Sequence, residues 1–71
     1  IMKTIKIIDC NKHEQNLNVD FIYNISSFEP GFKQPTVTEI SLHHKGEEHP
    51  FSVFKTYESV SSLLLRLEAY K

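Results

Sequence analysis

The sequence has little of what small proteins use to reinforce a thin core. Cys10 is the only cysteine in 71 residues, so no intramolecular disulfide can form. A lone thiol is typical of a reducing compartment and argues against a secreted, disulfide-stapled domain. We interpret Cys10 as a small buried hydrophobe in preference to a reactive thiol. Because the N-terminus also lacks the pattern of a signal peptide, we expect a cytoplasmic protein.

Glycine is also scarce, which argues against a loop that binds phosphate. Gly31 and Gly46 are the only two, which is too few for a glycine-rich phosphate loop. No serine lies in a GxSxG nucleophile elbow, and no CxxC or HExxH spacing offers a metal site. We therefore predict that the protein is not an enzyme and that it has no cofactor and no resident metal.

An excess of charge of one sign is also missing. Eight basic residues stand against nine acidic ones, the net charge is −1, and the basic residues are scattered along the chain. A nucleic-acid-binding protein normally has a basic stripe, because counterion release supplies much of its affinity. No apolar run approaches the roughly 20 residues of a membrane span. A membrane is therefore not expected as a partner, and nucleic acid is not favoured.

The remaining composition is that of an ordinary globular chain, with 39% hydrophobic and 24% charged residues. A chain of this length buries only about 60% of the surface that its unfolded form exposes. Residues 1–71 are therefore predicted to make a single small domain with a thin core. Such domains gain stability from a disulfide, a metal or a partner chain, and we expect a homodimer or a docked protein to fill this need.

Period-two hydrophobicity predicts two strands in the first part of the chain. Ile5 and Ile7 share one face of Lys3–Asp9, and the polar stretch Cys10–Asn16 follows as a turn. Leu17–Ile25 then alternates between apolar and mostly polar residues, which is typical of a half-buried antiparallel strand. Its predicted core face consists of Leu17, Val19, Phe21, Tyr23 and Ile25.

The next two strands are predicted to form a hairpin, Thr36–His44 with Pro50–Thr56. We place Gly46–Glu47 at the centre of a type II′ turn, which favours glycine first. Opposite charges then meet at the tip and apolar residues meet along the strands. The predicted cross-strand pairs are Lys45 with Glu48, His44 with His49, Leu42 with Phe51 and Ile40 with Val53.

A helix is predicted to end the chain, with Thr56 as its N-cap and Glu58 in its first turn. Leu65 falls about 140° from Val60 at 100° per residue, on the outer side. The class is therefore α+β, a four-stranded antiparallel sheet with the C-terminal helix on one face (β-β-β-β-α). The predicted buried stripe of the helix consists of Val60, Leu63, Leu64, Leu67 and Tyr70.

Three of the four histidines lie in the stretch HHKGEEH, residues 43–49. In the predicted register, His44 and His49 face each other with Cβ atoms about 5 Å apart. A zinc site needs three or four ligands, and Glu47 or Glu48 would have to supply a third. We interpret this stretch as a polar hairpin tip, and metal binding by the two histidines stays open.

Apolar residues outside the predicted core mark candidate interaction surfaces. The loop Ser26–Pro35 contains two phenylalanines, which either fold back onto the core or form an apolar tip offered to a partner. Ile8, Ile22 and Phe54 are predicted on the sheet face that the helix leaves uncovered. The interaction surface that we predict consists of Phe28, Phe32, Leu65, Phe54 and Ile22.

These features predict a non-enzymatic protein-interaction module, a small stand-alone inhibitor or regulator that docks on a larger protein. The composition is similar to that of small sheet-plus-helix proteins encoded by phages and mobile elements, anti-CRISPR proteins included, and no residue motif accompanies this likeness.

The alternative is a small homodimeric single-stranded nucleic-acid-binding protein. A β-β-β-β-α unit that dimerises through its helices resembles the single-stranded DNA-binding transcriptional coactivators in shape. That resemblance implies aromatic stacking in a sheet groove with lysines on the nucleic-acid backbone. The residues that would serve are Tyr23, Phe54, Lys6 and Lys55.

Overall fold

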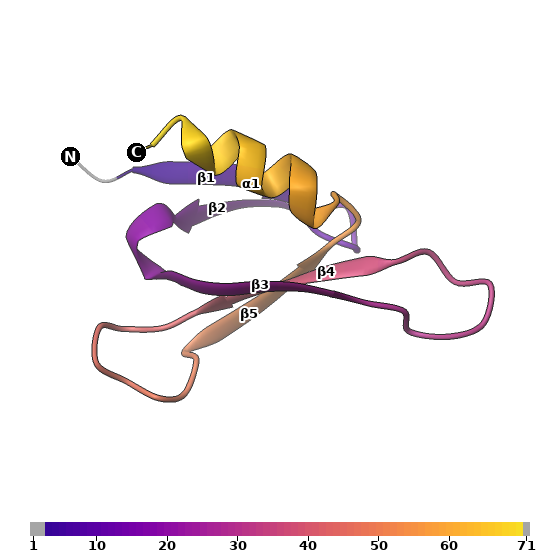
Figure 1. Cartoon of the computed structure of the whole chain (residues 1–71), viewed down its shortest axis with the longest axis horizontal. Coiled ribbons are helices and arrows are strands. Elements are labelled where there is room, and N and C mark those ends of the chain that lie inside the picture. Colours follow the sequence, from indigo (N-terminus) through magenta and orange to yellow (C-terminus); the bar gives the residue numbers. More distant parts are fainter. Residues whose placement is uncertain (1–2, 71) are drawn as a thin grey trace.

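Five strands and one C-terminal helix form two antiparallel sheets, a two-stranded sheet β1–β2 and a three-stranded sheet β3–β4–β5 (Figure 1). The structure is a computed structural model and describes residues 3–70. The α+β class and the final helix are confirmed, whereas the single four-stranded sheet is not observed. The elements are β1 (Thr4–Ile8), β2 (Glu14–Asn18), the 3-10 helix η1 (Val19–Phe21), β3 (Ile22–Phe28), β4 (Val37–Leu42), β5 (Ser52–Thr56) and α1 (Val60–Glu68).

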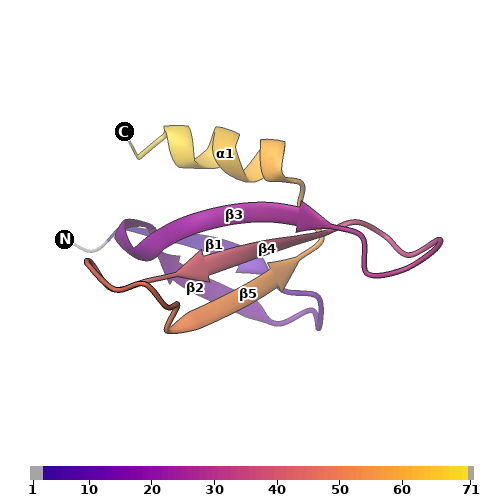
Figure 2. The same cartoon turned by 60° about the horizontal axis from the view of Figure 1, so that its bottom comes forward.

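The core lies between the two sheets and is closed by the helix. Figures 1 and 2 show the β1–β2 hairpin on one side of the three-stranded sheet, with α1 beside β1 and β3. An isolated bridge between Asp9 and Thr56 joins the end of β1 to β5, and the amide of Cys10 donates to the carbonyl of Lys55 (3.0 Å). The buried apolar cluster consists of Ile5, Ile7, Leu17, Ile40, Leu42 and Leu63.

The predicted strand Leu17–Ile25 is wrong as one continuous element. The side chain of Asn18 accepts a hydrogen bond from the amide of Asp20 (2.9 Å) and caps η1, so the chain turns and begins a second sheet. Such local side-chain bonds compete with strand pairing. This turn is the physical reason why one four-stranded sheet is replaced by two sheets.

A β-bulge in β3 corrects a second part of the same prediction. Ile22 lies opposite Leu42 and Asn24 lies opposite Ser41, so Tyr23 is the extra residue between them. Tyr23 is 72% exposed, although the alternating pattern placed it on the core face.

The β4–β5 hairpin is confirmed, but its register differs by one residue from the predicted one. Ile40 lies opposite Phe54, and Leu42 lies opposite Ser52. Because a slip of one residue reverses the face of every side chain, Phe54 points inward and Val53 points outward at 42% exposure.

The connection that sets this register is longer than a two-residue turn and spans residues 43–51. The amide of Glu47 donates to the carbonyl of His44 (3.0 Å), so Gly46 occupies the third position of the turn. Its φ of 84° suits that position of a type II turn, which requires a positive value. The predicted type II′ turn, which placed Gly46 at the second position, is therefore wrong.

The helix begins later than predicted. Ser59 is its N-cap and accepts from the amide of Ser62 (3.1 Å), so Thr56 does not cap it. Leu63 is buried and Leu65 is 74% exposed, as the helical spacing predicts, but Leu64 is 51% exposed although it was placed in the buried stripe. Within residues 3–70, no helix is long and apolar enough to cross a membrane.

Candidate functional site

The five residues of the predicted interaction surface do not form one patch. Phe32 lies in the β3–β4 connection at 89% exposure, Leu65 lies on the outer side of α1 at 74%, and Phe28 ends β3 at 37%. Ile22 and Phe54 are half-buried and pack against the core cluster. The expectation that these two are left uncovered is wrong, because the bulge and the shifted register turn both inward.

Two of the three exposed phenylalanines, Phe28 and Phe32, each have a lysine above the ring, whereas Phe51 stacks on His44. Lys55 Nζ lies 5.6 Å from the ring centroid of Phe28, and Lys33 Nζ lies 5.5 Å from that of Phe32. An ammonium group at this distance is attracted by the negative face of the ring. We call these four residues, which form two separate pairs, the Phe–Lys surface. The high exposure of Phe32 favours the apolar loop tip over the alternative in which both rings fold back onto the core.

The β3–β4 connection protrudes from the body of the molecule. Residues 29–36 are all exposed, and both views show this segment reaching beyond the sheets at one end (Figures 1 and 2). Val37 begins β4 directly after the loop and is buried, which ties the base of the loop to the body. The molecule is accordingly elongated, 40 × 26 × 21 Å.

The histidine-containing connection protrudes at the other end of the molecule and forms an aromatic cluster at its base. The ring of His43 stacks on Tyr23 with centroids 4.1 Å apart, and His44 stacks on Phe51 at the same distance. Phe21 meets His44 and Phe51 edge-on, at 5.3 and 5.5 Å. These ring contacts hold the long loop at the end of the β4–β5 ladder.

The predicted cross-strand pairing of His44 with His49 is wrong, because Leu42 and Ser52 are the last paired residues of the hairpin. Both histidines lie in the loop beyond that pair. Within residues 3–70, no three histidine, cysteine, aspartate or glutamate side chains lie close enough together to hold a metal ion.

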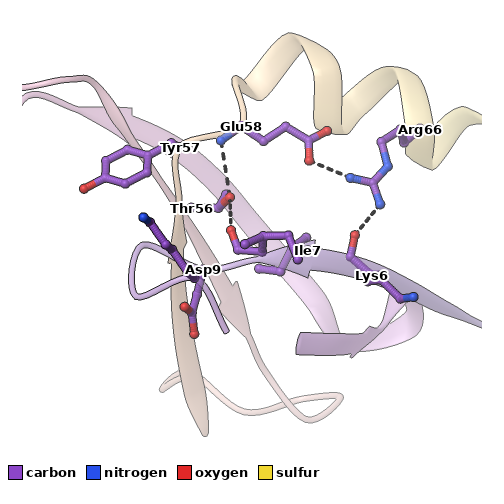
Figure 3. A pocket seen from close by; sticks show the side chains of 9 residues that line it. Lys6, Ile7, Asp9, Thr56, Tyr57, Glu58 and Arg66 are labelled. Atoms are coloured by element: carbon purple, nitrogen blue, oxygen red, sulfur yellow. Dashed lines mark hydrogen bonds and ion pairs between the residues drawn. The ribbon is translucent and has the colours of Figure 1, made fainter. Parts of the chain in front are cut away.

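A cavity of about 380 Å³ lies where the ends of β1 and β5 meet α1 (Figure 3). Arg66 spans it, donating to Glu58 Oε1 (2.5 Å) and to the carbonyl of Lys6. Glu58 also accepts from the hydroxyl of Ser62 (2.7 Å). Arg66 and Glu58, one cation and one anion of the lining, therefore neutralise each other. The cavity is lined by Lys6, Ile7, Ile8, Asp9, Lys12, Thr56, Tyr57, Glu58 and Arg66.

The carboxylate of Asp9 organises the turn between β1 and β2. Its Oδ1 accepts from the amides of His13 (2.8 Å) and Asn11 (2.9 Å), and its Oδ2 accepts from Gln15 Nε2 (3.1 Å). The amide of His13, and after it the side chain of Gln15, lower the pKa of Asp9 below its ordinary value of 3.8. These partners favour the charged form, so Asp9 is assigned to the fold and not to chemistry.

The residues that a nucleic-acid groove would use do not come together. Tyr23 is on the bulge beside His43, Phe54 points inward, and Lys6 forms an ion pair with Glu14 (3.4 Å). The signal that sequence reasoning missed is the pairing of Phe28 and Phe32, two of the exposed phenylalanines, each with a lysine. For Phe32 and Lys33 the two residues are adjacent in the chain, so this pair could have been found.

No family model, no curated protein and no solved structure matches this chain. The surfaces described above therefore carry the functional interpretation.

Proposed function

We propose that this chain is a non-enzymatic protein-interaction module, a small inhibitor or regulator that docks on a larger protein through the Phe–Lys surface. The observation that carries this proposal is Phe32, which is 89% exposed in a loop that protrudes from the body. Complete burial of a phenylalanine stabilises a complex by about 1.5–3 kcal/mol, and a monomer gains nothing from exposing one.

The surroundings of Phe32 suit an anchor residue. Binding hot spots combine an aromatic side chain that enters a pocket with a polar or charged rim. Lys33 lies over the ring of Phe32 and Lys55 lies over the ring of Phe28, so each ring has a cation beside it. The partner that fits is a protein with an apolar pocket edged by acidic groups.

A second apolar surface on α1 supports the same class of function. Leu64 is 51% exposed and Leu65 is 74% exposed, and they are adjacent on the outer side of the helix. Small stand-alone modules of this size and architecture suit a phage or mobile-element inhibitor of the anti-CRISPR kind, and this part of the proposal rests on size and architecture alone.

Site-specific photo-cross-linking tests the docking surface. A photoreactive phenylalanine analogue at position 32 is expected to capture a protein that the analogue at position 11, an exposed turn residue, does not capture. Binding of that purified protein is then measured for wild type, Phe32→Asp and Gln34→Asp. The last variant is the control, because it adds the same charge to another exposed position of the same loop.

The expected result is a loss of about tenfold or more in affinity for Phe32→Asp, with Gln34→Asp close to wild type. Equal binding by wild type and Phe32→Asp would remove the Phe–Lys surface from the proposal. Leu65→Asp in the same assay tells whether the helix surface contributes.

Single-stranded nucleic-acid binding is the second candidate, and the Phe–Lys surface favours it. Each ring and its ammonium group could take a base and the adjoining phosphate. Fluorescence anisotropy with oligothymidylate tests this function. Affinity that falls steeply with salt, and falls further in Phe32→Ala, supports it, whereas no change in anisotropy at low salt excludes it.

A further inference from the structure

The outer edge of β1 is closed by side chains from the C-terminal part of the chain. The amide of Val19 donates to the carbonyl of Lys3, which therefore faces β2. Because successive residues of a strand alternate in direction, the carbonyls of Thr4, Lys6 and Ile8 face away from β2. All three are hydrogen-bonded: Thr4 accepts from the hydroxyl of Tyr70, Lys6 accepts from Arg66, and Ile8 accepts from the hydroxyl of Thr56.

Among residues 3–70, no side chain is hydrogen-bonded to the outer edge of β2 in this way. The same alternation places the amides and carbonyls of Glu14, Asn16 and Asn18 on the side away from β1. Within residues 3–70, β1 is the only strand that pairs with β2. Asn16 is exposed, at the centre of this edge.

β2 also lacks the devices by which proteins protect an edge. Such strands normally carry lysine, proline, an unpaired charge or a bulge. The sequence of β2 is EQNLN, and its single charge, Glu14, is paired with Lys6 at 3.4 Å. The outer edge of β3, by contrast, has a bulge at Tyr23 and α1 beside it.

We infer that β2 is a self-association edge that pairs antiparallel with β2 of a second copy, about a two-fold axis at Asn16. Centring the pair on Asn16 uses all five residues of each strand and sets Glu14 opposite Asn18 of the second copy. The outward amides and carbonyls of Glu14 and Asn16, and the amide of Asn18, then form ladder hydrogen bonds, while the carbonyl of Asn18 accepts the first bond of η1. The two hairpins become one four-stranded sheet, which relieves the marginal stability of a two-stranded one.

The ends and centre of this pairing are complementary. The carboxamide of Asn16 lies opposite the carboxamide of Asn16 in the second copy, and two amide groups can donate hydrogen bonds to and accept them from each other. Lys12 precedes β2 and Asp20 follows it. An antiparallel pair brings the start of one strand beside the end of the other. Lys12 of each copy therefore lies near Asp20 of the other copy, and the two-fold axis gives two such attractive pairs. The interface is small, so the dimer is expected to form only at high protein concentration.

This inference goes beyond the proposed function, because Phe32 and Leu65 lie outside β2. The two proposals are tested by different variants. Phe32→Asp tests docking and leaves the β2 edge unchanged. Substitutions at Asn16 test the β2 edge and leave the Phe–Lys surface unchanged.

Disulfide trapping is the decisive experiment. The full chain carrying Cys10→Ser and Asn16→Cys is oxidised and run on a non-reducing gel. Directly hydrogen-bonded antiparallel partners have Cα atoms about 5.5 Å apart, within the usual range for a disulfide. The expected result is a covalent dimer that forms much faster than in the control Cys10→Ser, Asn24→Cys, whose new cysteine lies at an exposed position of β3. Equal rates in both proteins would overturn the inference.

Light scattering over a concentration series gives an independent measurement with Asn16→Pro. The amide lost in that variant points away from β1, so no internal ladder bond is removed. Wild type is expected to dimerise with increasing concentration, and Asn16→Pro is expected to stay monomeric with a native circular-dichroism spectrum. If that variant does not fold, Asn16→Lys replaces it. A wild type that is monomeric at every concentration, or a variant that still dimerises, would overturn the inference.

Discussion

The hydroxyl of Tyr70 donates a hydrogen bond of 2.6 Å to the carbonyl of Thr4, which lies 66 positions earlier in the chain. This contact ties the C-terminal segment to the first strand and covers the outer edge of β1. Tyr70→Phe is expected to lower the free energy of unfolding by about 0.5–1 kcal/mol, since water replaces the lost donor at an exposed carbonyl. Urea denaturation measures the change. Tyr57→Phe, an exposed tyrosine, is the control and is expected to match wild type.

Arg66 links the helix to the same edge through Glu58 and the carbonyl of Lys6. Arg66→Met keeps much of the aliphatic stem and is expected to cost about 1–2 kcal/mol, because it leaves a half-buried carboxylate without its cation. Glu58→Gln is expected to cost less, because an amide oxygen still accepts from Arg66. Unfolding of both variants in urea is compared with Lys45→Met at an exposed loop position. If Arg66→Met lowers the free energy of unfolding by no more than the control Lys45→Met does, the result contradicts this role.

The sequence predicted the elements that depend on local periodicity. β1, the β4–β5 hairpin and α1 occur where the patterns placed them, within a few residues. The break at η1 was missed because Leu17–Ile25 alternates as regularly as a continuous strand. Its only signal is Asn18 followed by Asp20, a pairing that favours a local side-chain bond over a ladder. That competition is decided by tertiary packing, which periodicity does not report.

The register of the hairpin and the location of the exposed surfaces could not be predicted for a related reason. Gly46 can supply a positive φ at the second position of a type II′ turn or at the third position of a type II turn, so the turn type is ambiguous. In the observed register the loop is longer, and His44 stacks on Phe51 within it. Phe54 then faces inward, and a predicted surface residue packs against the core cluster.

Leu63 and Leu65 are two residues apart and have opposite surroundings. Leu63 is 1% exposed in the core cluster, and Leu65 is 74% exposed. Leu63→Ala is expected to cost about 2–5 kcal/mol, because it removes packing and leaves a cavity. Leu65→Ala is expected to stay within about 0.5 kcal/mol of wild type, since surface substitutions rarely exceed that. Chemical denaturation of both proteins measures the contrast, and equal losses would mean that α1 packs through another face.

Asp9 makes the stability of the fold depend on pH in the acid range. The hydrogen bonds from the His13 amide and the Gln15 side chain lower the pKa of Asp9 below 3.8, so the unfolded chain binds this proton at a higher pH than the folded one. The stability that the charged carboxylate contributes is therefore complete above 3.8 and is lost as the pH falls through the lower, folded-state pKa.

In Asp9→Asn this acid-dependent part is expected to disappear. The amide has no proton to gain, and it accepts more weakly from the amides of Asn11 and His13 than a carboxylate does. The melting temperature of the variant should be below that of wild type at neutral pH and should converge on it as the solution is acidified. Glu29→Gln, which neutralises an exposed loop carboxylate, is the control and should keep the wild-type slope. If the melting temperatures of wild type and Asp9→Asn instead differ by a constant amount throughout the acid range, the charge of Asp9 does not contribute and the turn is held by its backbone alone.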